Sequence, residues 1–248
     1  MIVGATALGV FLGRRVRHLA ETLAEPFGVL QGALLGLVAL VLAFGMSLAL
    51  SRYDDRRATV VEEANTIGTT WLRAQTLPEP ERRRSLNLLI DYAGSAIRLA
   101  DNIPASDEEE AASADEEELQ RGLWALAGQA LDDAPQDSAP RLYVETLNEM
   151  IDAQAVRVAA LNNHVPDAVL LLEVLGASLA LGLLAAYLAI VGRGILAVSL
   201  ASVLVAFLLL ITFDLDRPTR GMIQVPDTAL RNQLDSMELP PAARGPRR

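Results

Sequence analysis

The chain of 248 residues contains no cysteine and no lysine, and only 4% of its residues are aromatic. Without cysteine, it can form neither a disulfide bond nor a thiolate metal site. All 21 basic residues are arginine, which excludes chemistry that requires a lysine amine, such as Schiff-base formation. The sequence also contains only two histidines, His18 and His164, and they are far apart along the chain.

Charge is almost absent from three long apolar runs. These runs cover residues 28–50, 168–190 and 195–213, and Glu173 is the only formally charged residue in them. Each run has about 20 residues, which is the length that a helix needs to cross the ~30 Å hydrocarbon core of a bilayer. We therefore predict an all-α integral membrane protein.

A further apolar segment opens the chain. It is followed by Arg14, Arg15 and Arg17, whereas a signal peptide carries its positive charge before the apolar stretch. We expect a short first membrane helix over 1–20, which pairs with helix 28–50 in an N-terminal hairpin, 1–50. A second hairpin covers 167–213, where Gly182 and Ala186 predict close approach of a neighbouring helix. A chain with three spans is the alternative.

An acidic region separates these membrane segments. Residues 51–166 contain 22 acidic residues and 11 arginines, which disfavours nucleic acid as a partner. No proline interrupts residues 51–73, so we predict an acidic helical domain that begins as a continuation of the second membrane helix. The acidic run 107–118 lacks the ligand spacing and glycine of an EF-hand, and we predict no metal and no cofactor. Residues 214–248 are expected to form a polar tail.

Polar residues form a stripe on the predicted continuation. Glu62, Thr66, Thr69 and Arg73 are spaced by four, three and four residues and therefore share one helix face. One interpretation is a solvated or interhelical face, in which Arg73 meets an acidic neighbour. The other is the lining of a pore, which the small polar residues at the same end of the membrane helix favour. The pore-lining or ion-contact candidates are Ser47, Ser51, Glu62, Asn65, Thr66, Thr69 and Arg73.

A second polar cluster follows the last apolar run. Asp214, Asp216 and Arg217 precede Pro218, which ends a helix, and Arg220 follows it. Structural anchoring at the membrane exit is one interpretation, and an ion-binding vestibule or subunit interface is the other.

Several motifs are similar to those of one family. They are Ser-Arg-Tyr at 51–53, VEEANTIGTTWLR at 61–73, LNEMID at 147–152 with Arg157, His-Val-Pro at 164–166, and DLDRP at 214–218 with Arg220 and Gly221. Together they resemble the bestrophin-like domain family of bacterial membrane proteins, which is distantly related to bestrophin anion channels. The chain lacks a recognisable acidic calcium clasp after its last apolar run, so the resemblance does not extend to calcium gating.

The resemblance implies a homo-oligomeric ring in the lipid bilayer, with the second helix lining a pore for small inorganic ions, anions above all. It also implies a bacterial inner membrane, with the acidic domain in the cytoplasm. The positive-inside rule, applied to Arg14, Arg15, Arg17 and Arg193, would place that domain outside. The sequence has no catalytic constellation, so we do not expect an enzyme. The alternative function is a membrane-anchored helical scaffold or sensor that binds a partner through its acidic domain.

Overall fold

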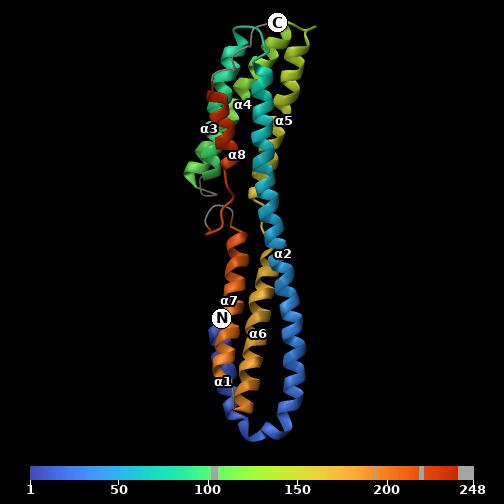
Figure 1. The fold of residues 1–248 in the computed structure, drawn as a ribbon, viewed down its shortest axis with the longest axis vertical. Helices are drawn as coiled ribbons and strands as arrows, with labels where there is room; N and C mark the ends of the chain where they lie inside the picture. Colours follow the sequence, from blue (N-terminus) through green and yellow to red (C-terminus); the bar gives the residue numbers. More distant parts are fainter. Residues whose placement is uncertain (102–105, 193, 218–220, 240–248) are drawn as a thin grey trace, which may run out of the picture. The chain divides into compact units, whose positions relative to one another are not determined.

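The computed structural model describes the backbone of residues 1–101, 106–192, 194–217 and 221–239 (Figure 1). Every regular element in these ranges is a helix, which confirms the predicted all-α class. The chain divides into two compact units. The described part of unit 1 contains residues 1–53, 164–192, 194–217 and 221–223, and that of unit 2 contains residues 54–101, 106–163 and 224–239.

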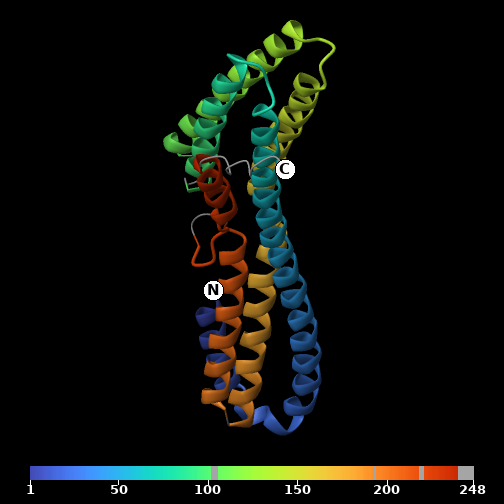
Figure 2. The ribbon, with the colours of Figure 1, turned by 45° about the horizontal axis from the view of Figure 1, so that its top comes forward.

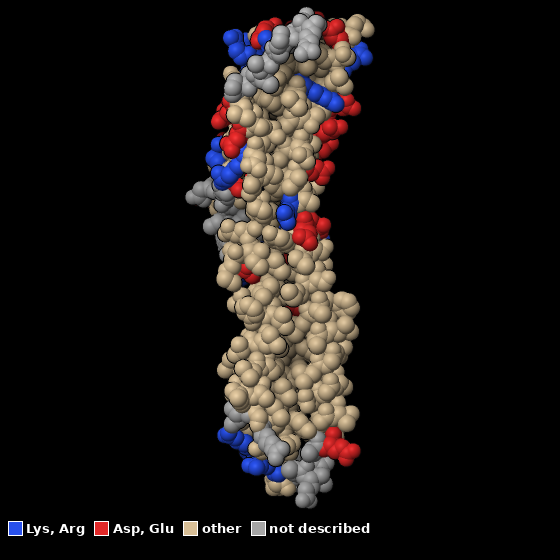
Figure 3. Space-filling view, viewed as in Figure 1, with Lys and Arg blue, Asp and Glu red and all other residues tan. Residues whose placement is uncertain are grey.

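Unit 1 contains the apolar helices. They are α1 (Ile2–Arg15), the first part of α2 (Ala20–Ala74), α6 (Asp167–Val191) and α7 (Ile195–Leu215). Three of them, α2, α6 and α7, are long and apolar enough to cross a membrane. The 14 residues of α1 are fewer than the ~20 that a perpendicular span requires. Figure 3 shows a wide area of unit 1 surface without charged side chains, whereas charged side chains are numerous over unit 2.

Small residues allow α1 to pack directly on α6. A side chain at Gly9 would collide with the carbonyl oxygen of Gly182, and one at Gly13 would collide with the carbonyl oxygen of Ala186. The two glycines are four residues apart, so they lie on one face of α1. Such small-residue faces let helix backbones approach closely where lipid removes the hydrophobic drive to associate.

One face of α2 packs into the core of unit 1, where Figure 2 shows α2 beside α6. Val38 and Leu42 are buried against Ala177, Ala180 and Leu209. Seven residues after Leu42 along α2, Ala49 is buried with Val165 and Leu215. This face follows the three- and four-residue steps of a helix, so the opposite face of α2 points away from the unit 1 core.

Unit 2 surrounds the second part of α2 with shorter helices. These are α3 (Glu81–Asp101), α4 (Asp107–Asp133), α5 (Ser138–Leu161) and α8 (Thr228–Glu238). Pro78 and Pro80 lie between α2 and α3, in the segment that separates the two helices. The most deeply buried large side chains of the core come from all five helices: Ile67, Leu89, Tyr92, Leu123, Tyr143, Leu147, Met150 and Leu230.

The structure differs from our expectation of a polar tail after residue 213. Residues 228–238 form helix α8, and Leu230 and Met237 are buried in the core of unit 2. Leu234, between them, packs against the same core. The steps of four and three residues give α8 an apolar stripe, but the many polar residues and prolines around it mask this signal in the sequence.

The α1–α6 contact leads to a first prediction. Gly13→Leu should lower the thermal unfolding midpoint of the purified protein by several degrees, because the side chain cannot fit against the α6 backbone. Gly4→Leu is the matched control on the same helix, since nothing lies within 4 Å of a Cβ at Gly4. Equal midpoints for the two variants would contradict the close packing.

Candidate functional site

One face of α2 is left uncovered by the described part of unit 1. Leu40, Phe44, Ser47 and Ser51 follow one another in steps of four, three and four residues, and all four are exposed. The exposed fraction reaches 66% for Phe44 and 53% for Leu40. The sequence predicted a role for Ser47 and Ser51 but missed Leu40 and Phe44, because leucine and phenylalanine are unremarkable in a membrane helix. Their helical spacing from Ser47 and Ser51 is the sequence feature that could have identified them.

The polar residues predicted to share one face of α2 differ in their exposure in unit 2. Glu62, Asn65 and Thr69 are exposed and continue the same helical spacing. Thr69 donates a hydrogen bond only to the main chain of its own helix, at the carbonyl oxygen of Asn65, 3.0 Å away. These three side chains therefore form an exposed polar face of α2.

The other two members of the stripe, Thr66 and Arg73, are half-buried. Thr66 Oγ1 donates to the carbonyl oxygen of Glu63 at 2.9 Å. Arg73 donates to the carbonyl oxygen of Leu142 at 2.7 Å and pairs with the Glu145 carboxylate at 3.3 Å. Arg73 therefore connects the end of α2 to α5. This contact agrees with the interpretation of the stripe as an interhelical face in which Arg73 meets an acidic neighbour.

A buried ion cluster connects four helices of unit 2. The guanidinium of Arg157 on α5 contacts the carboxylates of Glu63 on α2 and Glu116 on α4. Its Nη2 lies 3.2 Å from Oε1 of Glu116, and its Nε forms a close ion pair with Glu63. Tyr92 on α3 donates to Glu63 at 3.2 Å, and Gln154 donates to Glu116 at 2.9 Å. The charged side chains are at most 1% exposed.

The charges of this cluster do not balance when both carboxylates are ionised. Burial raises the pKa of Glu116 to about 7, although the charge of Arg157 opposes that rise and the charge of Glu63 adds to it. Burial also raises the pKa of Tyr92, and the nearby carboxylates act in the same direction. Glu116 is therefore positioned to take up a proton near neutral pH while Arg157 stays charged.

Arg56 is a second buried arginine that the sequence analysis missed. It is 1% exposed, and its Nη2 donates to the carbonyl oxygen of Asn163 at 2.8 Å. Its Nε donates to the carbonyl oxygen of Ala160 at 3.2 Å. These carbonyl groups lie at the C-terminal end of α5, where a cation satisfies free acceptors and complements the helix dipole.

The second predicted cluster holds the main chain of unit 1 around the end of α7. Asp214 accepts hydrogen bonds from the amides of Met222 and Ile223, each at 2.8 Å. Asp216 accepts one from the amide of Val165, also at 2.8 Å. Arg217 is exposed, and Arg220 lies outside the described residues.

Glu173 lies against the buried face of α2. Its side chain is 1% exposed, and neither carboxylate oxygen has a hydrogen-bond partner among the described residues. The carboxylate occupies the space that a side chain at Gly45 would need. This close approach between α6 and α2 therefore requires glycine at position 45.

The described residues contain no group of three or more His, Asp or Glu side chains placed to hold a metal ion.

The ion cluster predicts a pH dependence of stability. Glu116 binds its proton more tightly in the folded protein than in the unfolded chain, where the pKa is near 4.5. Its contribution to stability is therefore fully present below pH 4.5 and is lost as the pH rises through about 7. Thermal unfolding of wild type and Glu116→Gln should be compared from pH 4.5 to 8. The difference between their free energies of unfolding should change by up to ~3 kcal/mol over this range.

Glu117→Gln is the control for this titration, because the neighbouring Glu117 side chain is 65% exposed. Its stability curve should run parallel to that of wild type. Parallel curves for wild type and Glu116→Gln over the same range would refute the proposed protonation.

Comparisons with known proteins agree on one fold. A crystal structure of a bacterial bestrophin homologue from Klebsiella pneumoniae, carrying a tyrosine-to-alanine mutation, is 19% identical, with a TM-score of 0.68 over 96% of this chain and 99% of that one. A tryptophan-to-alanine variant of this homologue gives 19% identity and a TM-score of 0.70 over 96% and 97%. The form of this homologue solved by Zn-SAD phasing is 20% identical, with a TM-score of 0.67 over 97% of this chain and 100% of that one.

No curated protein is similar enough to match the chain. The model of the bestrophin-like domain, in contrast, matches residues 2–230, which is nearly the whole length. This match includes both the membrane-spanning helices and the acidic unit with its buried ion cluster. The chain is a member of the bestrophin-like domain family.

Proposed function

We propose that the protein is an oligomeric membrane channel in which α2 lines the pathway of small ions. The observation that carries this proposal is the uncovered face of α2, which presents Ser47 and Ser51 near the end of an apolar run. Hydroxyl groups gain little from contact with lipid but can contact water or a permeating ion in a pore. Family membership and the resemblance to bestrophin anion channels support the same assignment.

In a ring of identical chains, the exposed face of α2 would line the central axis. Copies arranged around one axis would direct Leu40, Phe44, Ser47 and Ser51 of every chain toward the centre, while the exposed leucines of α6 and α7 face lipid or a neighbouring copy. Closed rings are the usual outcome when one surface of a subunit contacts a different surface of the next. Leu40 and Phe44 would then form an apolar part of the pathway, and Ser47 and Ser51 a polar part.

We further propose that the membrane helices act as two hairpins, α1 with α2 and α6 with α7. Close packing on α6 supports membrane insertion of the short helix α1, and Arg14, Arg15 and Arg17 can extend their side chains toward the interface. The extramembrane domain in this proposal is the acidic helical region that starts at residue 51.

Anions are the proposed preferred ions. The hydroxyl groups of Ser47 and Ser51 and the side-chain amide of Asn65 offer hydrogen-bond donors along the exposed face, whereas the Thr69 hydroxyl donates to its own helix. Glu62 lies on the same face in unit 2 and would attract cations at the mouth. Thr66 and Arg73 remain candidates for ion contact through the exposed part of their side chains. Chloride and potassium must therefore be measured side by side.

The polar cluster at the end of α7 is proposed to anchor the chain at the membrane exit. The carboxylates of Asp214 and Asp216 already bind main-chain amides, which supports a structural role for both. The exposed Arg217 is the member that remains available for a subunit interface or vestibule, and Arg220 is proposed to act with it.

We propose that the protein resides in a bacterial inner membrane with the acidic unit in the cytoplasm. A fluorescent reporter fused after Arg248 should then fluoresce, whereas an alkaline phosphatase fusion at the same position should be inactive. An active phosphatase fusion without fluorescence of the other reporter would place the C-terminus on the opposite side.

Ion flux tests the proposed pathway. Purified protein in liposomes should carry chloride, and Ser51→Trp should reduce that flux at least tenfold, because a bulky ring from every copy would occlude the axis. Leu200→Trp is the matched control, since Leu200 is 63% exposed on α7. Both variants should retain the oligomeric state of wild type in detergent.

Unchanged flux through a correctly assembled Ser51→Trp variant would remove α2 from the pathway. Absence of protein-dependent flux of either ion, from folded and inserted protein, would favour the membrane-anchored scaffold or sensor instead.

A further inference from the structure

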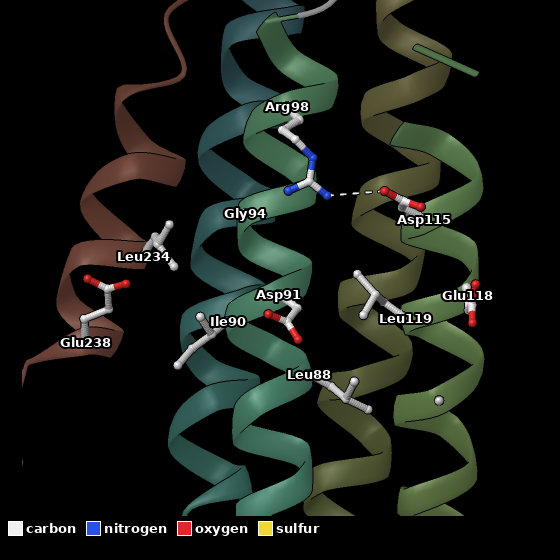
Figure 4. A pocket seen from close by; sticks show the side chains of 11 residues that line it. Leu88, Ile90, Asp91, Gly94, Arg98, Asp115, Glu118, Leu119, Leu234 and Glu238 are labelled. Atoms are coloured by element: carbon white, nitrogen blue, oxygen red, sulfur yellow. Dashed lines mark hydrogen bonds and ion pairs between the residues drawn. The ribbon is translucent and has the colours of Figure 1, made fainter. Parts of the chain in front are cut away.

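Unit 2 contains a groove between helices α3, α4 and α8 (Figure 4). Its volume is about 640 Å³. Leu88 and Ile90 from α3, Leu119 from α4 and Leu234 from α8 form its apolar lining. Gly94 on α3 lines it as well. The groove can therefore hold a peptide-sized group in contact with apolar side chains.

Carboxylates from all three helices border the groove. Asp115 pairs with the guanidinium of Arg98 at 3.4 Å, as Figure 4 shows. Asp91, Glu118 and Glu238 also line the groove, and no ion-pair partner for them exists among the described residues. The border thus carries four negative charges and one positive charge, so a positively charged occupant fits it.

A positively charged segment of the same chain starts at this border. Residues 240–248 have the sequence PPAARGPRR, with three arginines and no acidic residue, and they lie outside the described residues. Glu238, the last residue of α8, lines the groove, and only Leu239 separates it from this segment. An extended chain of nine residues reaches up to ~30 Å, so it can follow the groove in either direction.

We propose that residues 240–248 bind in this groove of their own chain, with their arginines beside Asp91, Glu118 and Glu238. The covalent connection through Leu239 gives the segment a high effective concentration at the groove, so individually weak surface ion pairs suffice to keep it there. A bound segment would hold α8 against α3 and α4 and would neutralise the acidic border. This inference concerns unit 2 alone and does not depend on ion conduction.

Engineered disulfides test the proposal directly, because the chain has no cysteine of its own. The test pair is Gly94→Cys with Gly245→Cys, which keeps every charge of the groove and of the segment. A Cβ at Gly94 has no neighbour closer than Arg98 Nη1, at 3.8 Å. The control pair is Gly128→Cys with Gly245→Cys, since Gly128 is exposed on α4, does not line the groove and has nothing within 4 Å of its Cβ.

Oxidation of the full-length protein should link positions 94 and 245 within one chain at least fivefold faster than positions 128 and 245, as measured by mass spectrometry of the linked peptides. Adding Arg244→Glu, Arg247→Glu and Arg248→Glu to the test pair should reduce its rate to that of the control. Equal rates for the two pairs, or a rate that charge reversal leaves unchanged, would overturn the proposal. A disulfide mainly between two copies would assign the groove to a second chain instead.

Discussion

The guanidinium of Arg157 lies between the carboxylates of Glu63 and Glu116 in the interior of unit 2. Removing Arg157 would leave two buried carboxylates without a positive counterpart, and an uncompensated buried charge is among the most costly changes in a protein core. The cluster therefore fixes the rotation of α2 about its axis, because Glu63 must point inward. With successive residues 100° apart, Glu62, Asn65 and Thr69 are then directed outward. The exposed polar face of α2 is a consequence of this buried contact.

An analogous constraint acts on α2 in unit 1 through packing instead of charge. Ala49 and Gly45 face the interior, and the carboxyl group of Glu173 fills the space beside Gly45. Because these positions point inward, Ser47 and Ser51 point outward. Within each unit, the outward face of α2 is thus determined by contacts on the opposite face, and this relation underlies the assignment of α2 to an ion pathway.

The motifs that resemble the bestrophin-like family coincide with these contacts. Glu63 and Arg157 belong to two separate motifs and form one ion pair. His164 and Asp216 belong to two others, and His164 Nδ1 lies 2.9 Å from the main-chain oxygen of Asp216. The family pattern therefore includes residues that hold helices together, and its presence in the sequence does not by itself identify residues that contact ions.

Local sequence patterns predicted the parts of the fold that depend on neighbouring residues. Hydropathy located the three helices that are long and apolar enough to cross a membrane, and the absence of proline over residues 51–73 indicated that the acidic region begins as a helix. Contacts between distant residues could not be predicted in this way. Glu63 and Glu116 lie 94 and 41 residues from Arg157, and nothing in their local sequence separates them from exposed neighbours such as Glu62 and Glu117. The helix α8 was missed because its apolar stripe is short, and its apolar residues are buried only by packing on a core that is distant in sequence.

The proposed aqueous ion pathway runs along the exposed face of α2. The most direct measurement uses the cysteine-free chain with Ser51→Cys or, as a control, Ala49→Cys, and adds a charged thiol reagent during flux in liposomes. We expect the reagent to block flux through Ser51→Cys and to leave flux through Ala49→Cys unchanged, because Ala49 is fully buried. Undiminished flux through Ser51→Cys after complete labelling would show that this face of α2 does not line the ion pathway.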